Sequence, residues 1–302
     1  MRKFENYDLI SRNSNLKQDF KLSEGLERKL IKLSYQTVLT FLKNVFPLFD
    51  NETSCEECTD KFIKLFSVAK KQNLISRGGV PEKNYLLLSM TAQLLNPTLY
   101  VESGFFKGSS IHAVSQSKKL RRIIGFDPKH TNYRAILPKH LNVSLFKSDF
   151  ADYDFNEEDL SLSLLYFDDH INTAERIIQA SDKGFKNLIF DDSCGLMGTV
   201  ERKFPSMPSL FFIENIENFS KNDEILWSKQ GKKKLNFFNL FDINIKRKKS
   251  YLSFKFDEAS ISLCREAKNR ILSITKMPDL NDFIKTNNLT TNDVTQHFVV
   301  LK

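Results

Sequence analysis

The apolar positions of this chain change their period near residue 97. Before it, apolar residues recur every three or four positions, as they do on one face of an α-helix. This spacing predicts helices over residues 23–46, 61–71 and 82–95. We therefore expect an N-terminal helical extension over residues 1–95, which starts with a polar arm that has no period of its own.

After residue 97 the apolar residues gather into short continuous runs separated by helical stretches. The runs cover residues 98–102, 122–126, 142–146, 162–167 and 187–190. Helical stretches cover residues 109–118 and 172–181. Strands buried on both faces have this continuous apolar character, and strands that alternate with helices form parallel sheets. The sequence predicts a Rossmann-like α/β domain over residues 96–302, with a doubly wound, mostly parallel sheet and helices on both faces.

The pattern is weaker after residue 192. It predicts a loop, a helix, a strand, a second helix and a last strand over residues 193–208, 209–230, 250–256, 258–270 and 297–301. We expect the part around residues 193–256 to be an insertion that forms a lid or part of the substrate pocket.

The turn after the first run has the composition of a ligand-binding turn. Gly104 lets the backbone turn sharply, and Gly108 allows a ligand or another segment to come close. Ser109 suits the start of the helix that follows. Such a turn also occurs as a plain strand-to-helix connection.

Every later run is followed by carboxylates. They are Asp127, Asp149, Asp168 with Asp169 and His170, and Asp191 with Asp192. The carboxyl ends of parallel strands share one rim, where ligands of open α/β sheets bind. Asp127 is about twenty residues beyond the glycine turn, where an acid binds ribose hydroxyls, and Asp149 suits an adenine amino group. Each Asp is also an ordinary turn residue, and Asp168–His170 also suit a hydrogen-bonded turn and helix cap.

Residues 98–192 resemble the class I S-adenosylmethionine-dependent methyltransferases. The closest resemblance is to the branch with a Glu-x-Gly-x-x-x-Gly-x-Ser first motif, which includes sugar and macrolide O-methyltransferases and cephalosporin-hydroxylase-like proteins. The motif matches Glu102, Gly104, Gly108 and Ser110. The resemblance implies that S-adenosylmethionine is bound by Glu102, Gly104, Gly108, Ser109, Asp127, Asp149 and Asp168.

The same resemblance implies a magnesium ion at the rim. Its ligands would be Asp191, Asp192 and one aspartate after the fourth strand, Asp169 or Asp168, with His170 as the general base. Converging carboxylates repel one another unless a cation neutralises them, and oxygen ligands suit Mg²⁺. The ion would lower the pKa of an acceptor hydroxyl, and an imidazole with a pKa of ~6.5 suits proton removal.

Charge and cysteine content bear on two other functions, nucleic-acid binding and zinc binding. Residues 231–255 hold eight basic residues against one acid, which is nearly all of the net charge of +8. This basic window leaves nucleic-acid methylation open, although no recognised nucleic-acid module is present and no Asn/Asp-Pro-Pro-aromatic segment follows Phe167. Cys55 and Cys58 form a lone Cys-x-x-Cys without the further ligands that zinc needs, so we expect reduced thiols in a loop.

The leading prediction is a cytoplasmic, magnesium-assisted O-methyltransferase that acts on a hydroxyl of a small polar molecule, such as a sugar or a secondary-metabolite moiety. We expect no membrane span, because no apolar stretch approaches ~18 residues. A homo-oligomer is left open. The alternatives are a nucleic-acid methyltransferase and a non-catalytic Rossmann-like binding or assembly module. The absence of a Gly-x-Ser-x-Gly elbow argues against a hydrolase.

Overall fold

The computed structural model describes most of the chain outside the N-terminal arm, the basic window and the segment before the last strand. The described residues are 24–47, 49, 53–75, 80, 82–128, 132–169, 171–191, 200–201, 204–205, 207–230, 234–237, 251–278, 280 and 296–302. In this part of the chain, no helix is long and apolar enough to cross a membrane.

Three helices precede the sheet, as the apolar spacing predicts. They are α2 (Glu24–Val45), α3 (Cys55–Lys71) and α4 (Glu82–Leu95). Helix α3 begins at Cys55, so the prediction that Cys55 and Cys58 lie in a loop is wrong. Glu56 and Glu57 occupy the first turn of α3, where negative charge stabilises a helix N-terminus. Burial raises the pKa of both thiols, which favours their protonated form.

The central sheet has seven strands in the order β11-β12-β5-β4-β1-β2-β3. Their bounds are β1 (Leu99–Ser103), β2 (Arg122–Phe126), β3 (Asn142–Phe146), β4 (Ser163–Phe167), β5 (Asn187–Phe190), β11 (Ile271–Lys276) and β12 (His297–Leu301). Strands β1 to β5 pair in parallel, and β12 pairs antiparallel with both β5 and β11. The mostly parallel, doubly wound sheet is therefore confirmed, and its strand order reverses between β1 and β4.

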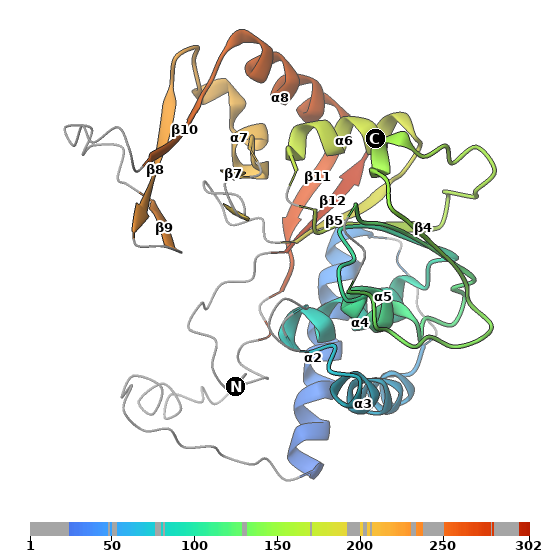
Figure 1. The fold of residues 1–302 in the computed structure, drawn as a ribbon. Coiled ribbons are helices and arrows are strands. Elements are labelled where there is room, and N and C mark those ends of the chain that lie inside the picture. Colours follow the sequence, from blue (N-terminus) through green and yellow to red (C-terminus); the bar gives the residue numbers. More distant parts are fainter. Residues whose placement is uncertain are drawn as a thin grey trace, which may run out of the picture.

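Helices cover both faces of the sheet. Helix α4 and helix α5 (Ser109–Val114) lie on one face, and α6 (Thr173–Asp182), α7 (Leu210–Glu214) and α8 (Glu258–Arg270) lie on the other (Figure 1). Successive strand residues alternate between the faces, as the geometry of a strand requires. Tyr100 and Tyr166 join the hydrophobic core on the α4 face, whereas Val101 and Phe167 join the core on the α6 face.

The structure differs most from the predicted elements after residue 200. The prediction of a helix over residues 209–230 is wrong, because α7 ends at Glu214 and is followed by a 3₁₀ turn (Ile216–Asn218). Strand β8 (Glu224–Gln230) then pairs antiparallel with β9 (Lys234–Phe237) and β10 (Tyr251–Lys255). Strand β11 was not predicted. Two-residue strands β6 (Val200–Glu201) and β7 (Phe204–Pro205) form a further pair. Residues 1–22 and most of the basic window lie outside the described residues.

Candidate functional site

Backbone hydrogen bonds continue the parallel pairing one residue beyond the strands. They run from Gly104 N to Phe126 O (2.7 Å), from Asp127 N to Phe146 O (3.0 Å), from Asp168 N to Ser103 O (2.9 Å) and from Asp191 N to Phe167 O (2.9 Å). These bonds fix the turn and the three aspartates at the same edge of the sheet. The carboxyl edge around the β1/β4 reversal is the place where ligands of open α/β sheets bind.

The turn after β1 depends on Gly104. Its φ is +95°, and a Cβ there would lie 2.6 Å from the carbonyl carbon of Asp168. No other residue fits this backbone without moving the end of β4. Phe105 points into the core, where it fills the space over Gly125, and Phe106 is exposed. The Phe106 N–H donates a hydrogen bond of 2.9 Å to Oδ2 of Asp127, so the turn also holds the acid that follows β2.

A tyrosine covers the second glycine of the turn. Gly108, with a φ of +79°, is the N-cap residue of α5, and Ser109 begins the helix. The ring of Tyr133 lies against Gly108 where a side chain would otherwise stand. Burial raises the pKa of Tyr133 to about 12. The Ser109 hydroxyl donates to the carbonyl of Leu74 (2.8 Å), so its side chain ties α5 to the segment after α3.

Glu102 is completely buried at the end of β1. Its carboxyl accepts hydrogen bonds from the hydroxyls of Ser110 and Tyr100, the latter at 3.0 Å. Burial raises the pKa of Glu102 well above its usual range, the Ser110 bond opposes this shift, and the charge of Asp168 adds to it. Glu102 is therefore a fixed, buried acceptor that two hydroxyl groups orient.

The two aspartates after β4 act on opposite faces of the sheet. Asp168 raises the pKa of Glu102 and of Tyr166, both of which lie on the α4 side. The carboxylate of Asp169 instead accepts a hydrogen bond of 2.9 Å from Nε of Arg176 on α6. The structure thus groups Asp168 with Glu102 and gives Asp169 a cationic partner on the other face.

Arg176 is 2% exposed and joins two acids of the predicted site. Its terminal nitrogens donate to both oxygens of Asp149, at 2.7 and 2.8 Å, and one of them lies 2.8 Å from Asp169. Burial alone would lower the pKa of Arg176, but the bonds to Asp149 and Asp169 outweigh it and raise the pKa. The same guanidinium lowers the pKa of Asp149. Both Asp149 oxygens are therefore engaged in an ion pair.

Asp191, at the end of β5, sits in a buried chain of hydrogen bonds. The hydroxyl of Tyr166 donates to its Oδ2, and Nδ2 of Asn84 donates to its Oδ1 at 3.1 Å. Gln296, which precedes β12, donates through Nε2 to the Tyr166 hydroxyl at 3.1 Å. Asn84 and Gln296 are 2% and 0% exposed, and their amide oxygens have no hydrogen-bond partner among the described residues.

Two members of the predicted metal and base set, His170 and Asp192, lie outside the described residues. Among the described residues, no three His, Cys, Asp or Glu side chains are grouped closely enough to hold a metal ion. Asp168 and Asp191 both act on Tyr166 and Glu102 and so lie on the same face, and carboxylate oxygens are ligands that a hard cation such as Mg²⁺ accepts.

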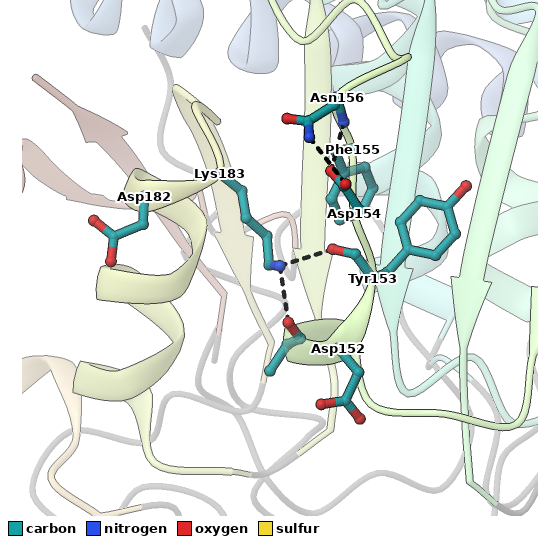
Figure 2. Close-up of a pocket in the computed structure, with 8 residues that line it drawn as sticks. Asp152, Tyr153, Asp154, Phe155, Asn156, Asp182 and Lys183 are labelled. Carbon is teal, nitrogen blue, oxygen red and sulfur yellow. Dashed lines mark hydrogen bonds between the residues drawn. The ribbon is translucent and has the colours of Figure 1, made fainter.

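A pocket of about 310 Å³ lies away from this rim, beside the C-terminal end of α6 (Figure 2). Residues 151–156, Asp182 and Lys183 line it. The ammonium group of Lys183 donates to the carbonyls of Ala151 and Tyr153, both at 2.8 Å, and this brings α6 against the segment after β3. None of the predicted site residues lines this pocket.

Several residues of the rim escaped the sequence analysis. They are Asn84, Tyr100, Tyr133, Tyr166, Arg176 and Gln296. A signal was present for two of them, since Tyr100 precedes Glu102 by two positions and Tyr166 precedes Asp168 by two. Residues two apart on a strand share a face, so each tyrosine lies on the face of its acid.

No family model matches the chain, and no curated protein matches it. Solved structures do match. An O-methyltransferase from Bacillus cereus in complex with SAH is 16% identical, with a TM-score of 0.38 and coverage of 68% of this chain and 96% of that one. The O-methyltransferase TomG from Streptomyces achromogenes, involved in tomaymycin synthesis and in complex with SAM, is 13% identical, with a TM-score of 0.36 and coverage of 68% and 95%.

A third match is an S-adenosylmethionine-dependent methyltransferase from Clostridium acetobutylicum. It is 13% identical, with a TM-score of 0.35 and coverage of 80% of this chain and 98% of that one. All three are methyltransferases, the class that the Glu102–Ser110 motif resembles. At these identities and scores the likeness carries no argument about activity, so the function proposed next rests on the rim residues.

Proposed function

We propose that this chain is an S-adenosylmethionine-dependent O-methyltransferase that acts on a hydroxyl of a small polar molecule, such as a sugar or a secondary-metabolite moiety. The observation that carries the proposal is the turn after β1. Gly104 packs against Asp168 with no room for a side chain, Glu102 is buried beside it, and the Phe106 N–H holds Asp127. One turn therefore connects the acids at three strand ends.

In this proposal Glu102, Gly104 and Gly108 would hold the methionine and ribose part of the cofactor, and Asp127 would accept hydrogen bonds from its ribose hydroxyls. Bound S-adenosylmethionine supplies an electrophilic methyl group on a sulfonium. The side chains of Ser109 and Asp149 are bonded to Leu74 and Arg176, so any contact that these two residues make with the cofactor would come from their backbone atoms.

We further propose that a magnesium ion is held by Asp168, Asp191 and Asp192. We prefer Asp168 to Asp169 because the Asp169 carboxylate is neutralised by Arg176, whereas Asp168 acts on the face where Asp191 lies. A bound Mg²⁺ lowers the pKa of a hydroxyl that it contacts. His170 would accept the proton, since an imidazole is partly neutral near pH 7.

Transfer of a labelled methyl group tests this function. The full chain is incubated with methyl-labelled S-adenosylmethionine and a panel of catechols, sugars and phenolic metabolites, with magnesium or with EDTA. We expect label on a hydroxyl oxygen, a large loss with EDTA, and a loss of at least about 100-fold in Asp191→Asn. Asp182→Asn, at the surface end of α6, is the matched control and should retain full activity.

The alternatives give different results in the same assay. Label in added RNA or DNA, with none in the small acceptors, would replace the small-molecule proposal by the nucleic-acid alternative. Transfer to a hydroxyl that is unchanged by EDTA would remove magnesium from the mechanism while leaving the O-methyltransferase. No transfer and no cofactor binding would favour the binding-module alternative.

A further inference from the structure

Phe106, in the turn after β1, has a backbone conformation that is unusual for its residue type. Its φ is +39°, in the left-handed region that bulky side chains rarely adopt. The other described residues besides glycine with a positive φ are Asn73, Asn96 and Asn222, and asparagine tolerates this conformation. A strained backbone of this kind persists where the surrounding structure fixes it, and it is frequent at ligand sites.

Packing within the protein does not account for the Phe106 side chain. The neighbouring Phe105 is 2% exposed and joins the hydrophobic core on the α4 face. Phe106 is 38% exposed and belongs to neither hydrophobic core of the described residues. The turn thus holds a large apolar ring at the carboxyl edge of the sheet, in an unfavourable backbone conformation. A ligand that contacts the ring would account for both features.

The bonds of the turn indicate which part of the proposed cofactor the ring would meet. The Phe106 N–H donates to Oδ2 of Asp127 at 2.9 Å, and the proposed function assigns this acid to the ribose hydroxyls. Gly104 and Gly108, on either side of Phe106 in the sequence, are assigned to the methionine and ribose part. The sulfur of S-adenosylmethionine joins the ribose to the methionine and carries a positive charge. Phe106 therefore belongs to the sulfonium part of the proposed site.

The ring of Phe106 has the chemistry that a sulfonium needs. Nζ of Lys107 lies 5.7 Å from the ring centroid, within the range of about 6 Å for a cation–π contact. Aromatic rings recognise quaternary ammonium ligands by the same electrostatic attraction. A sulfonium resembles a quaternary ammonium, because it is a cation without an N–H or O–H group to donate a hydrogen bond.

We propose that the ring of Phe106 binds the sulfonium of S-adenosylmethionine and makes the site prefer this cofactor to S-adenosylhomocysteine, which lacks the charge. This inference rests on the proposed function, which assigns the cofactor to the turn after β1. It accounts for a strained aromatic residue between two glycines. Methyl transfer removes the charge of the sulfur, so the contact weakens when the product forms, and this favours product release.

Calorimetric titration of S-adenosylmethionine and of S-adenosylhomocysteine into the full chain tests the inference. Phe106→Leu keeps an apolar side chain but has no aromatic face. We expect it to weaken S-adenosylmethionine binding about 3- to 10-fold and S-adenosylhomocysteine binding less than about twofold. Phe106→Tyr keeps the ring and should bind both within about twofold of wild type. Damage to the turn alone would weaken both ligands together.

A third variant and a control guard against effects on folding. Phe106→Asn suits the left-handed backbone and lacks the ring, so it should lower the preference for S-adenosylmethionine as Phe106→Leu does. Phe66→Leu is the matched control, because Nζ of Lys70 lies over the Phe66 ring at 4.2 Å, but this ring stacks on Phe62 within α3. It should change neither affinity. Circular dichroism of each variant shows that it is folded.

Each other result overturns a different statement. Equal losses for the two ligands in Phe106→Leu and Phe106→Asn would show that the ring packs on an uncharged part of the cofactor, and the sulfonium contact would be refuted. Wild-type affinities in both variants would refute any contact with Phe106 while leaving the cofactor site. A folded wild-type protein that binds neither ligand would refute the proposed function, and this inference with it.

Discussion

Replacing Arg176 by methionine should destabilise the protein by about 3 kcal/mol. The guanidinium is 2% exposed and joins Asp149 to Asp169 with contacts of 2.7–2.9 Å. Removing one partner of a buried ion pair costs about 3–5 kcal/mol, because the remaining charge stays buried without compensation. The Asp169 side chain is 12% exposed, but that of Asp149 is 34% exposed, so solvent screens its share and we expect the lower end of this range.

Urea denaturation at pH 7 measures this cost, and Arg270→Met is the matched control. Arg270 also has two carboxylate partners, Asp182 and Glu266, but these are 58% and 51% exposed, so its loss should cost less than about 1 kcal/mol. If Arg176→Met is no more destabilising than Arg270→Met, Arg176 does not hold the rim together.

The pH dependence gives a second check on Arg176. Its bonds lower the pKa of Asp149 in the folded state, so this stabilisation is complete above the unfolded pKa of about 3.9 and is lost as pH falls through the lower folded value. In Arg176→Met, protonation at low pH instead removes the charge of the unpaired carboxylates, so the variant recovers part of the lost stability. The difference between the two proteins should therefore shrink below pH 4, and a constant difference would contradict the ion-pair explanation.

Two further predictions concern the face of α4 and the glycine turn. Burial lowers the pKa of His112 to about 4 in the folded state, against about 6.5 unfolded, so the unfolded chain binds the proton first and stability falls by about 3 kcal/mol between pH 6.5 and 4. Urea denaturation at both pH values measures this fall. In His112→Gln the free energy of unfolding should fall by about that much less than in the wild type, and an equal fall in both proteins would contradict the prediction. Gly104→Ala should cost at least about 1–2 kcal/mol in thermal denaturation, because φ is +95° and the Cβ collides with Asp168, whereas Gly25→Ala on α2 meets no atom within 4 Å and should be neutral or stabilising. Equal melting temperatures for the two alanine variants would contradict the packing at Gly104.

The central parallel strands β1 and β4 were predictable because burial on both faces leaves a continuous apolar run. The bounds of β2 and β5, of the partly buried edge strand β3 and of the antiparallel strand β12 also agree with those predicted from the sequence. The prediction of a single helix over residues 209–230 was wrong because the apolar residues there are dense enough to fit both the helical period and the alternation of a strand. Asn222, with a φ of 81°, marks the turn before β8, but an isolated Asn in a polar stretch is a weak signal.

The rim was predictable only in part. The sequence predicted that the acids share one edge of the sheet, because the carboxyl ends of parallel strands always lie at the same edge. Adjacent residues at a strand end point to opposite faces, so Asp168 and Asp169 had to be separated, but which face holds Arg176 depends on the packing of α6. Asn84 is far from the strand ends in sequence, and Gln296 precedes β12, whose antiparallel pairing beside β5 the sequence pattern does not reveal. Only the tertiary structure brings Asn84 to Asp191 and Gln296 to Tyr166.

The central claim is that the turn after β1 binds S-adenosylmethionine, and calorimetric titration of the cofactor into the full chain tests it most directly. We predict micromolar binding that weakens about 10- to 100-fold in Asp127→Asn, which loses charge-assisted hydrogen bonds, and that is unchanged in Asp154→Asn, whose side chain bonds to Asn156 beside the pocket in Figure 2. A folded wild-type protein that gives no heat of binding, or Asp127→Asn with wild-type affinity, would contradict the claim.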